Sequence, residues 1–262
     1  MRLSVQEPLL GQVGLDEKLR LLEESGFSGM EVMGRPEVGE KIKVYRDAIS
    51  TSRIRISTIC SGYPGDLLSP EKSSREQAIN GIVERLRWAR ELGAVGVIFV
   101  PTFGQPKLPD LWPLFQNVVE VEKRLLIEEA KVLGKHAEDL GVYALLEPLN
   151  RYETHLINRA EQALEVLEAV GSEGVKMMLD FFHMNIEEAN IGEAIRKAGK
   201  HLAHIHLADS NRLLPGYGHT DFSALKVLRE IGYDKYGALE CRIPGDPRVE
   251  LPKFTKFISR FL

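Results

Sequence analysis

The sequence predicts a (β/α)8 barrel, and three observations support this fold class. The 262-residue chain alternates amphipathic helical segments with short apolar runs, and a glycine stands at most of the joints. Eight apolar runs occur, so a strand–loop–helix unit repeats about every 33 residues, a suitable length for such a module. No linker, charge block or low-complexity segment divides the chain. We therefore expect one TIM-barrel domain over residues 1–262, an ordinary length for this architecture.

The predicted strands follow one another along the chain. Each is short and nearly all apolar, as expected for parallel strands that are buried on both faces. They cover residues 3–5, 29–32, 54–59, 95–100, 142–146, 175–179, 202–207 and 236–239. Eight units without interruption favour a closed barrel over the alternative, an open doubly wound sheet. No Gly-x-Gly-x-x-Gly motif follows the first strand, so a dinucleotide cofactor is not indicated.

Glycines and capping residues mark where the predicted helices end and begin. Gly93, for example, follows a helical segment, where the backbone often adopts a positive φ that glycine tolerates best. Helix starts are expected at Ser69, which precedes a proline, at Asn158, which has a glutamate at capping-box spacing, and at Asp221. These signals agree with the strand positions and support the repeating unit.

Composition excludes several classes of protein. The chain has 34 Lys and Arg against 38 Asp and Glu, a net charge of −4, so a surface that coats nucleic acid is not expected. Its two cysteines, Cys60 and Cys241, cannot build a disulfide framework or a four-thiolate zinc site. The first residues lack the apolar stretch of a secretory signal, and no run approaches the ~20 apolar residues that span a bilayer. We expect a cytoplasmic protein with no nucleic-acid or membrane partner.

Four polar residues stand at the ends of four consecutive predicted strands. In chain order they are Glu147, Asp180, His206 and Glu240. Their intervals of 33, 26 and 34 residues are about one unit each, so the four side chains should converge at one opening of the barrel. Three carboxylates and one imidazole suit Mn²⁺, Mg²⁺ or Co²⁺ better than a closed structural zinc. Each residue alone is compatible with a helix cap or a core hydrogen bond, but three carboxylates buried together would repel one another without a cation.

Further polar side chains lie close to these positions in the sequence. Glu153, His183 and Arg212 each follow one of the four within six residues. Surface ion pairs are the alternative role for Glu153 and Arg212, and a helix cap is the alternative for His183. Arg212 would also suit a carboxylate end group of a substrate, since its planar fork binds both oxygens, or it would stabilise an oxyanion.

The segments around these residues resemble the xylose isomerase-like TIM-barrel superfamily. Within it they are most similar to the D-tagatose and D-psicose 3-epimerase-like enzymes, which act on ketoses, and to related keto-sugar-acid epimerases. The matching stretches are residues 146–153, 179–185, 204–209, 215–222 and 239–241. Apart from the glycine-containing loop at 215–222, these are four motifs in the right order, and they make the resemblance specific between about residues 140 and 245, whereas the first half matches mainly by its repeating unit.

The resemblance implies a role for each of the polar side chains. The implied metal ligands are Glu147, Asp180, His206 and Glu240, with Mn²⁺ the preferred ion. Two of these, Glu147 and Glu240, would also be catalytic. The residues implied to contact substrate oxygens are Glu153, His183 and Arg212.

We therefore predict an isomerase, a metal-dependent epimerase that inverts C3 of a ketose or keto-sugar acid. The reaction removes a weakly acidic proton beside a ketone and returns it to the opposite face. A metal-bound enediolate would carry the negative charge, and two carboxylates would act as base and acid. The expected partner is a small-molecule ketose or keto-sugar acid, and the expected assembly is a homo-oligomer, a dimer or a tetramer.

Three alternatives stay open at this point. An aldose–ketose isomerase, including a hydroxypyruvate isomerase-like enzyme, would use the same metal and the same enediolate. An AP-endonuclease-like nuclease would need a multi-zinc cluster, and the strand ends at 58–60 and 99–101 offer no histidine for it. A non-catalytic sugar-binding barrel would not need paired carboxylates.

Overall fold

The eight predicted strands close into a parallel barrel in the computed structural model, which describes residues 1–262. Each strand pairs with the next along the chain, and β1 pairs with both β2 and β8 to close the ring. The strands are β1 (Arg2–Gln6), β2 (Gly29–Met33), β3 (Arg55–Cys60), β4 (Gly96–Phe99), β5 (Tyr143–Leu146), β6 (Val175–Asp180), β7 (Leu202–Leu207) and β8 (Tyr236–Leu239). The predicted (β/α)8 TIM-barrel fold is confirmed.

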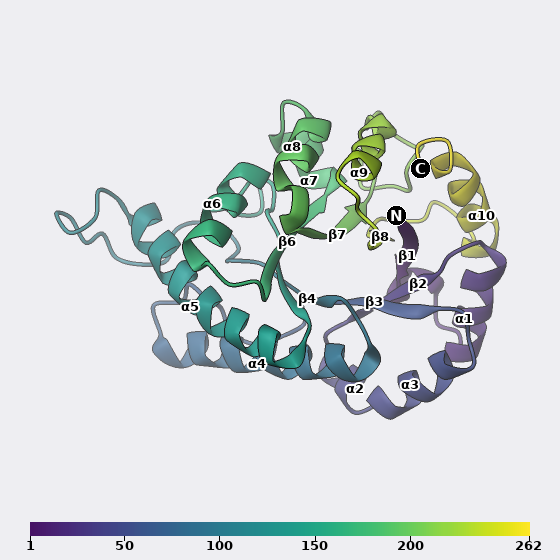
Figure 1. The fold of residues 1–262 in the computed structure, drawn as a ribbon, viewed down its shortest axis with the longest axis horizontal. Coiled ribbons are helices and arrows are strands. Elements are labelled where there is room, and N and C mark those ends of the chain that lie inside the picture. Colours follow the sequence, from purple (N-terminus) through teal and green to yellow (C-terminus); the bar gives the residue numbers. More distant parts are fainter.

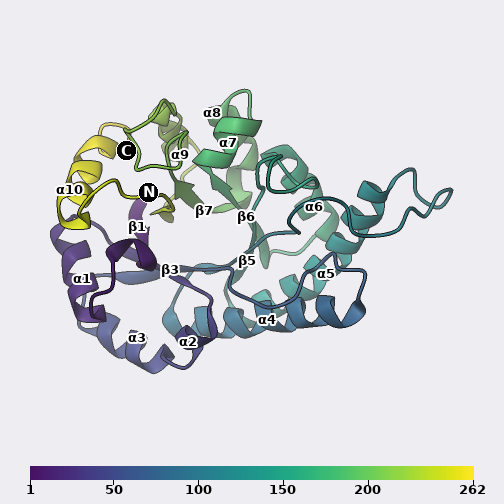
Figure 2. The same cartoon turned by 180° about the vertical axis from the view of Figure 1, so that it is seen from behind.

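Helices surround the strands on the outside, as the two opposite views in Figures 1 and 2 show. The α-helices are α1 (Leu15–Glu24), α2 (Pro36–Gly39), α3 (Ile42–Ser50), α4 (Lys72–Leu92), α5 (Val118–Leu140), α6 (Ala160–Val170), α7 (Phe181–Glu187), α8 (Ile191–Ala198), α9 (Lys226–Glu230) and α10 (Pro247–Ile258). Short 3-10 helices cover η1 (Glu7–Leu10), η2 (Gly199–His201) and η3 (Phe222–Leu225). None of the helices is both long enough and apolar enough to cross a membrane.

The helix starts agree with the sequence at one of the three expected positions. Asp221 accepts a hydrogen bond from the backbone at the start of η3, as expected of a cap. Ser69 is not a cap, because its hydroxyl bonds with Glu71 and α4 begins only at Lys72. Asn158 is not a cap either, because its side chain donates to two carbonyls of the preceding loop and the next residue takes the N-cap position of α6.

The barrel interior and the layer between strands and helices are separate cores. Successive side chains of a strand point to opposite faces, so alternate residues line the inside of the barrel. A small apolar cluster of Cys60, Ile98, Leu145, Met178 and Ala203 is distinct from the main core that packs under the helices. The side chains two residues after Leu145 and two residues after Met178 therefore also point into the barrel, at its carboxyl end.

Two register shifts interrupt the otherwise regular strand pairing. Between β2 and β3, the pairing advances by two residues on β2 but by three on β3, between Ile56 and Ile59. Between β6 and β7, it advances by one residue on β6 but by two on β7, between Leu202 and His204. An extra residue in one strand re-aims neighbouring side chains, and such bulges are common next to active sites. Both shifts lie where buried polar residues replace the apolar interior.

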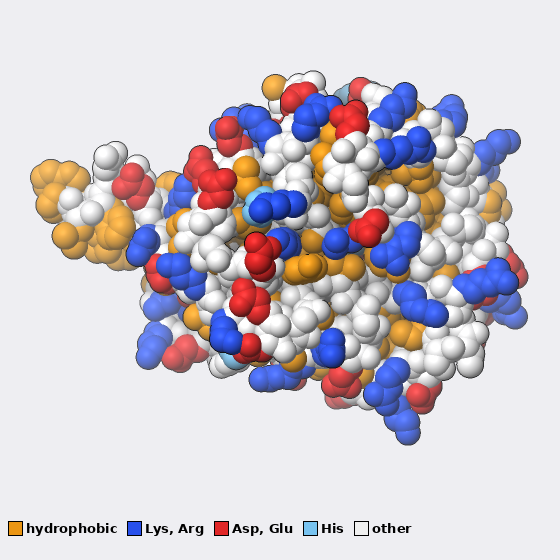
Figure 3. All heavy atoms as spheres, viewed as in Figure 1, with side chains coloured by type: hydrophobic (Ala, Val, Ile, Leu, Met, Phe, Trp, Pro, Cys, Tyr) orange, Lys and Arg blue, Asp and Glu red, His pale blue; other side chains and the backbone are white.

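The segment between β4 and α5 projects away from the barrel, at the left of Figure 1. Its tip carries hydrophobic side chains (Figure 3), with Trp112 75% and Leu114 82% exposed. Its root is fixed to the loop that follows β5, because the Gly104 N–H donates to the Glu153 carbonyl at 2.8 Å. His155, which is partly buried, contacts the buried Glu122 and the Gly104 carbonyl at the same junction.

Candidate active site

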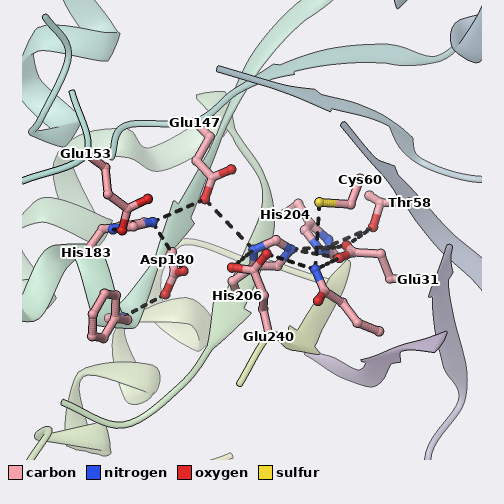
Figure 4. Close-up of polar contacts among 12 residues, drawn as sticks. Glu31, Thr58, Cys60, Glu147, Glu153, Asp180, His183, His204, His206 and Glu240 are labelled. Atoms are coloured by element: carbon pink, nitrogen blue, oxygen red, sulfur yellow. Dashed lines mark hydrogen bonds and ion pairs between the residues drawn. The ribbon is translucent and has the colours of Figure 1, made fainter. Parts of the chain in front are cut away.

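The four side chains predicted to bind a metal meet at the carboxyl end of the barrel (Figure 4). They are Glu147, Asp180, His206 and Glu240, and one ligand atom from each lies within 4.8 Å of the others. Glu147 stands two residues after Leu145, and Asp180 two after Met178, so strand alternation turns both toward the barrel axis. The sequence therefore identified residues that the fold does bring together.

One ring nitrogen of His206 faces this cluster, and the other makes a hydrogen bond to Glu31 on the opposite side of the ring. Its Nε2 lies 3.0 Å from Glu31 Oε1, and a carboxylate can only accept, so Nε2 carries the hydrogen of that bond. Its Nδ1 is buried and makes no hydrogen bond, although it lies 3.3 Å from Glu240 Oε2. A buried ring nitrogen without a partner, aimed at three carboxylates, fits a metal ligand.

Burial and neighbouring charges shift the pKa values of Glu147 and Glu240 in opposite directions. Burial, and then the negative charge of Glu240, raises the pKa of Glu147 well above its ordinary value. Burial acts in the same direction on Glu240, but His206 and Arg212 outweigh it and lower the pKa of Glu240 to about 2. Burial would lower the pKa of His206, yet Glu31 and Glu240 raise it well above its ordinary value. The site concentrates negative charge that a cation would balance.

His183 points its donor nitrogen into the site. Its Nδ1 accepts hydrogen bonds from the backbone and side-chain nitrogens of Asn150, at 3.2 and 2.8 Å, so the ring hydrogen lies on Nε2. Nε2 is 3.7 Å from Asp180 Oδ2 and 3.8 Å from Glu147 Oε1. Asn150 also donates to Glu153 Oε1 at 2.8 Å, so one amide orients two of the three predicted substrate contacts.

Arg212 spans two of the four predicted ligands. Its guanidinium donates to Asp180 Oδ2 at 3.2 Å and to Glu240 Oε2 at 2.6 Å, and it lies 4.5 Å from the centre of the Phe182 ring. The backbone of Arg212 has a φ of +60°, a conformation that residues other than glycine rarely adopt. A fixed cation at this rim of the site can stabilise negative charge on a bound molecule.

A second polar layer lies directly behind the four ligands, and sequence reasoning did not assign it. Its members are Gln6, Glu31, Thr58 and His204. Burial would raise the pKa of Glu31, but His206 and His204 outweigh it and hold that pKa well below its ordinary value. Glu31, Thr58 and His204 are polar side chains inside predicted strands, and Gln6 directly follows one; this is a visible signal, but one compatible with several roles. Cys60 adjoins this layer, and burial followed by the charge of Glu31 raises the pKa of its thiol, so it is no thiolate nucleophile.

Comparison with known proteins extends over nearly the whole chain. A family model described as xylose isomerase-like TIM barrel matches residues 19–257. The chain belongs to the xylose isomerase-like TIM barrel family. A 3-dehydro-D-guloside 4-epimerase of Escherichia coli (strain K12) is 31% identical to it over 252 residues, which is 94% of each chain. A D-psicose 3-epimerase of Agrobacterium fabrum is 43% identical over 173 residues, 63% of this chain and 60% of the relative.

The structural comparison agrees with the sequence comparison. The crystal structure of 3-keto-D-glucoside 4-epimerase from E. coli in its apo form matches with a TM-score of 0.89 and 28% identity, over 99% of both chains. These relatives in the xylose isomerase-like TIM barrel family are named as sugar epimerases, which belong to the isomerase class. This family member is therefore an isomerase-class enzyme, as the sequence predicted.

Proposed function

We propose that this protein is a metal-dependent sugar epimerase that inverts the carbon beside a keto group, specifically C3 of a ketose. The observation that carries the proposal is the convergence of Glu147, Asp180, His206 and Glu240 within 4.8 Å. Glutamates from β5 and β8 stand in this group, where they can exchange protons with a substrate held between them. The epimerase names of the relatives support the same reaction class.

The four ligands would hold a divalent cation, with Mn²⁺ proposed ahead of Mg²⁺ and Co²⁺. The buried and unpaired His206 Nδ1 supports this assignment, since an atom so placed otherwise loses its hydrogen bond to water without compensation. Three carboxylates with one imidazole suit these hard cations. When bound, the ion would act as a Lewis acid toward a carbonyl oxygen.

The protein's own side chains would move the proton and orient the sugar. Glu147 and Glu240 would act on opposite faces of the substrate, one removing the proton beside the ketone and the other returning a proton to the reverse face. His183 would donate from Nε2 to a substrate oxygen, and Glu153, oriented by Asn150, would accept from a hydroxyl.

Arg212 supports a neutral keto-sugar more than a sugar acid. Two of its nitrogens already donate to Asp180 and Glu240, so its planar fork is engaged by the protein's own carboxylates. A substrate carboxylate would have to compete with both of them. Stabilisation of negative charge on a substrate oxygen requires no such exchange and is the role we propose.

A second candidate is inversion of C4 in a 3-keto-glycoside. The relative that matches along 94% of both chains is named a 3-dehydro-D-guloside 4-epimerase, whereas the D-psicose 3-epimerase match covers 63% of this chain. The chemistry is the same in both cases, because C3 lies beside the C2 ketone of a ketose and C4 lies beside a C3 ketone. Only the position of the ketone in the bound sugar differs.

Isotope exchange tests the proposal and separates the candidates. The protein would be incubated with Mn²⁺ in D₂O with D-fructose, D-tagatose and a methyl 3-keto-glucoside, and products would be followed by NMR. Deuterium at C3 of a ketose, with the epimer formed, supports the 3-epimerase. Deuterium at C4 of the 3-keto-glucoside supports the second candidate, and deuterium at C1 or C2 supports an aldose–ketose isomerase. If no substrate takes up deuterium, the epimerase proposal is overturned.

A further inference from the structure

Glu31 of β2 lies outside the four strands that carry the predicted ligands, yet it contacts their cluster. It is fully buried, it accepts a hydrogen bond from His206 Nε2 at 3.0 Å, and its Oε2 lies 2.8 Å from His204 Nε2. The Thr58 hydroxyl donates to Glu31 Oε2. Figure 4 shows Glu31, Thr58 and His204 grouped at the right, on the side of His206 that faces away from Glu147 and Asp180.

Gln6 links Glu31 to a second ligand. Its side-chain nitrogen lies 2.9 Å from Glu31 Oε1 and 2.9 Å from Glu240 Oε1. A primary amide has two N–H donors, and the two carboxylates are its shortest contacts, with Cys60 Sγ farther away at 3.7 Å. The amide orientation is settled by its partners, since ionised carboxylates accept and do not donate. One buried carboxylate thus reaches His206 directly and Glu240 through a single amide.

We infer that Glu31 and Gln6 are positioning residues that fix the tautomer of His206 and the orientation of Glu240 for metal binding. This inference rests on the metal site of the proposed function. Because His206 Nε2 donates its hydrogen to Glu31, Nδ1 is the ring nitrogen that faces the cluster and would offer its lone pair to a cation. Because Gln6 takes Glu240 Oε1, the other oxygen, Oε2, is the one directed toward His206 Nδ1. Carboxylates and amides behind metal ligands commonly set affinity in this way.

A second metal site is the rival explanation for these residues. Glu31, Cys60 and His206 do offer three ligand atoms close together. However, the oxygens of Glu31 already accept from Gln6, Thr58 and His206, and Oε2 also lies 2.8 Å from His204 Nε2, so the lone pairs that a cation would need are engaged. The hydrogen bonds therefore favour a supporting role over a second ion.

Metal affinity measured without substrate tests the inference. Mn²⁺ would be titrated into metal-free wild type, Glu31→Gln and Gln6→Met, with calorimetry giving the Kd and the number of ions bound. Losing a carboxylate behind a ligand typically weakens metal binding about 10–100-fold, which is the expected result for Glu31→Gln. Gln6→Met keeps the side-chain length but removes both donors, so we expect a smaller loss of roughly tenfold, because Glu31 still holds His206.

Ser4→Ala is the matched control on the same strand as Gln6. The Ser4 hydroxyl is buried and bonds to the Ser57 hydroxyl at 2.7 Å, but it makes no hydrogen bond to Gln6, Glu31 or the four ligands. Its removal costs a buried hydrogen bond but should leave the Mn²⁺ Kd within about twofold of wild type. Circular dichroism of each metal-free variant checks that it is folded, and Gln6→Met keeps the inference testable if Glu31→Gln does not fold.

The outcomes separate this inference from the proposed function. A wild type that binds no Mn²⁺ would overturn both. A wild type that binds one ion per chain, with Glu31→Gln and Gln6→Met binding equally well, would overturn only the positioning role. Two ions per wild-type chain, with one lost in Cys60→Ala, would replace it with the second metal site. Weaker binding in both variants, with Ser4→Ala unchanged, would support it.

Discussion

The two halves of the barrel place their polar residues differently with respect to the four predicted ligands. The second half, β5 to β8, sets Glu147, Asp180 and Glu240 at or just beyond strand ends, where they face the opening of the barrel. The first half, β1 to β3, contributes Gln6 and Glu31, which are buried and bond to the second half from behind. We propose from this difference a division of labour, in which the second half would meet the substrate, while Gln6 and Glu31 of the first half would orient the groups that do.

The largest expected effect tests whether chemistry is confined to the second half. Glu240→Gln should lower kcat by about 10²–10⁴-fold or more at saturating Mn²⁺, because the amide can neither accept nor return the proton. Glu7→Gln is the first-half control, since Glu7 follows β1 but its oxygens accept from Lys18 and Tyr45 at 2.9 and 2.8 Å. Steady-state kinetics measures both variants. Full turnover by Glu240→Gln, or a comparable loss in Glu7→Gln, would contradict the division.

An intermediate effect is expected at the rim of the second half. Arg212→Lys should lower kcat/KM by about 10–100-fold, because one ammonium cannot reproduce a planar fork across Asp180 and Glu240, and a hydrogen bond to a charged group is worth about 1.5–3 kcal/mol. Arg151→Lys is the control, since Arg151 forks onto Glu187 and its side chain is 59% exposed. An equal loss of kcat/KM in Arg212→Lys and Arg151→Lys would contradict a specific role for Arg212 in the site.

The smallest effect concerns stability at α5, the helix that joins the halves. Burial raises the pKa of Glu129 from 4.5 to about 8, although Arg75 opposes the shift. The folded chain therefore binds a proton that the unfolded chain has released, so the stability contributed by Glu129 falls as pH rises from about 4.5 through about 8. Glu129→Gln should match wild type near pH 5 and exceed its Tm by roughly a few degrees at pH 9.

The control for this stability prediction is another carboxylate of the same helix. Glu128 is exposed and pairs with Arg124 and Lys131 at the surface. Thermal unfolding followed by circular dichroism at both pH values compares Glu129→Gln, Glu128→Gln and wild type. A pH-independent Tm difference in Glu129→Gln, or the same trend in Glu128→Gln, would show that the buried carboxyl of Glu129 is not the cause.

Much of the fold and part of the site could be predicted from local patterns. Strand alternation and unit spacing are local properties, so the sequence alone suffices to assign Glu147 and Asp180 to one opening of the barrel. Two of the three predicted helix starts were wrong, because the side chains of Ser69 and Asn158 can form hydrogen bonds in loops as well as in caps. The orientation of His183 by Asn150 crosses two units and has no local signal.

By itself, the sequence determined the eight-strand barrel and the four polar strand ends, since each depends on residues within one strand–loop–helix unit. Only the tertiary structure decided which side chains support them. Glu31 meets His206 across 175 residues, and Gln6 meets Glu240 across 234, because closing the ring brings β1 against β8 and turns β2 toward β7. The register shifts at β3 and β7 then re-aim the buried polar layer, and they arise from the pairing of strands that belong to different units.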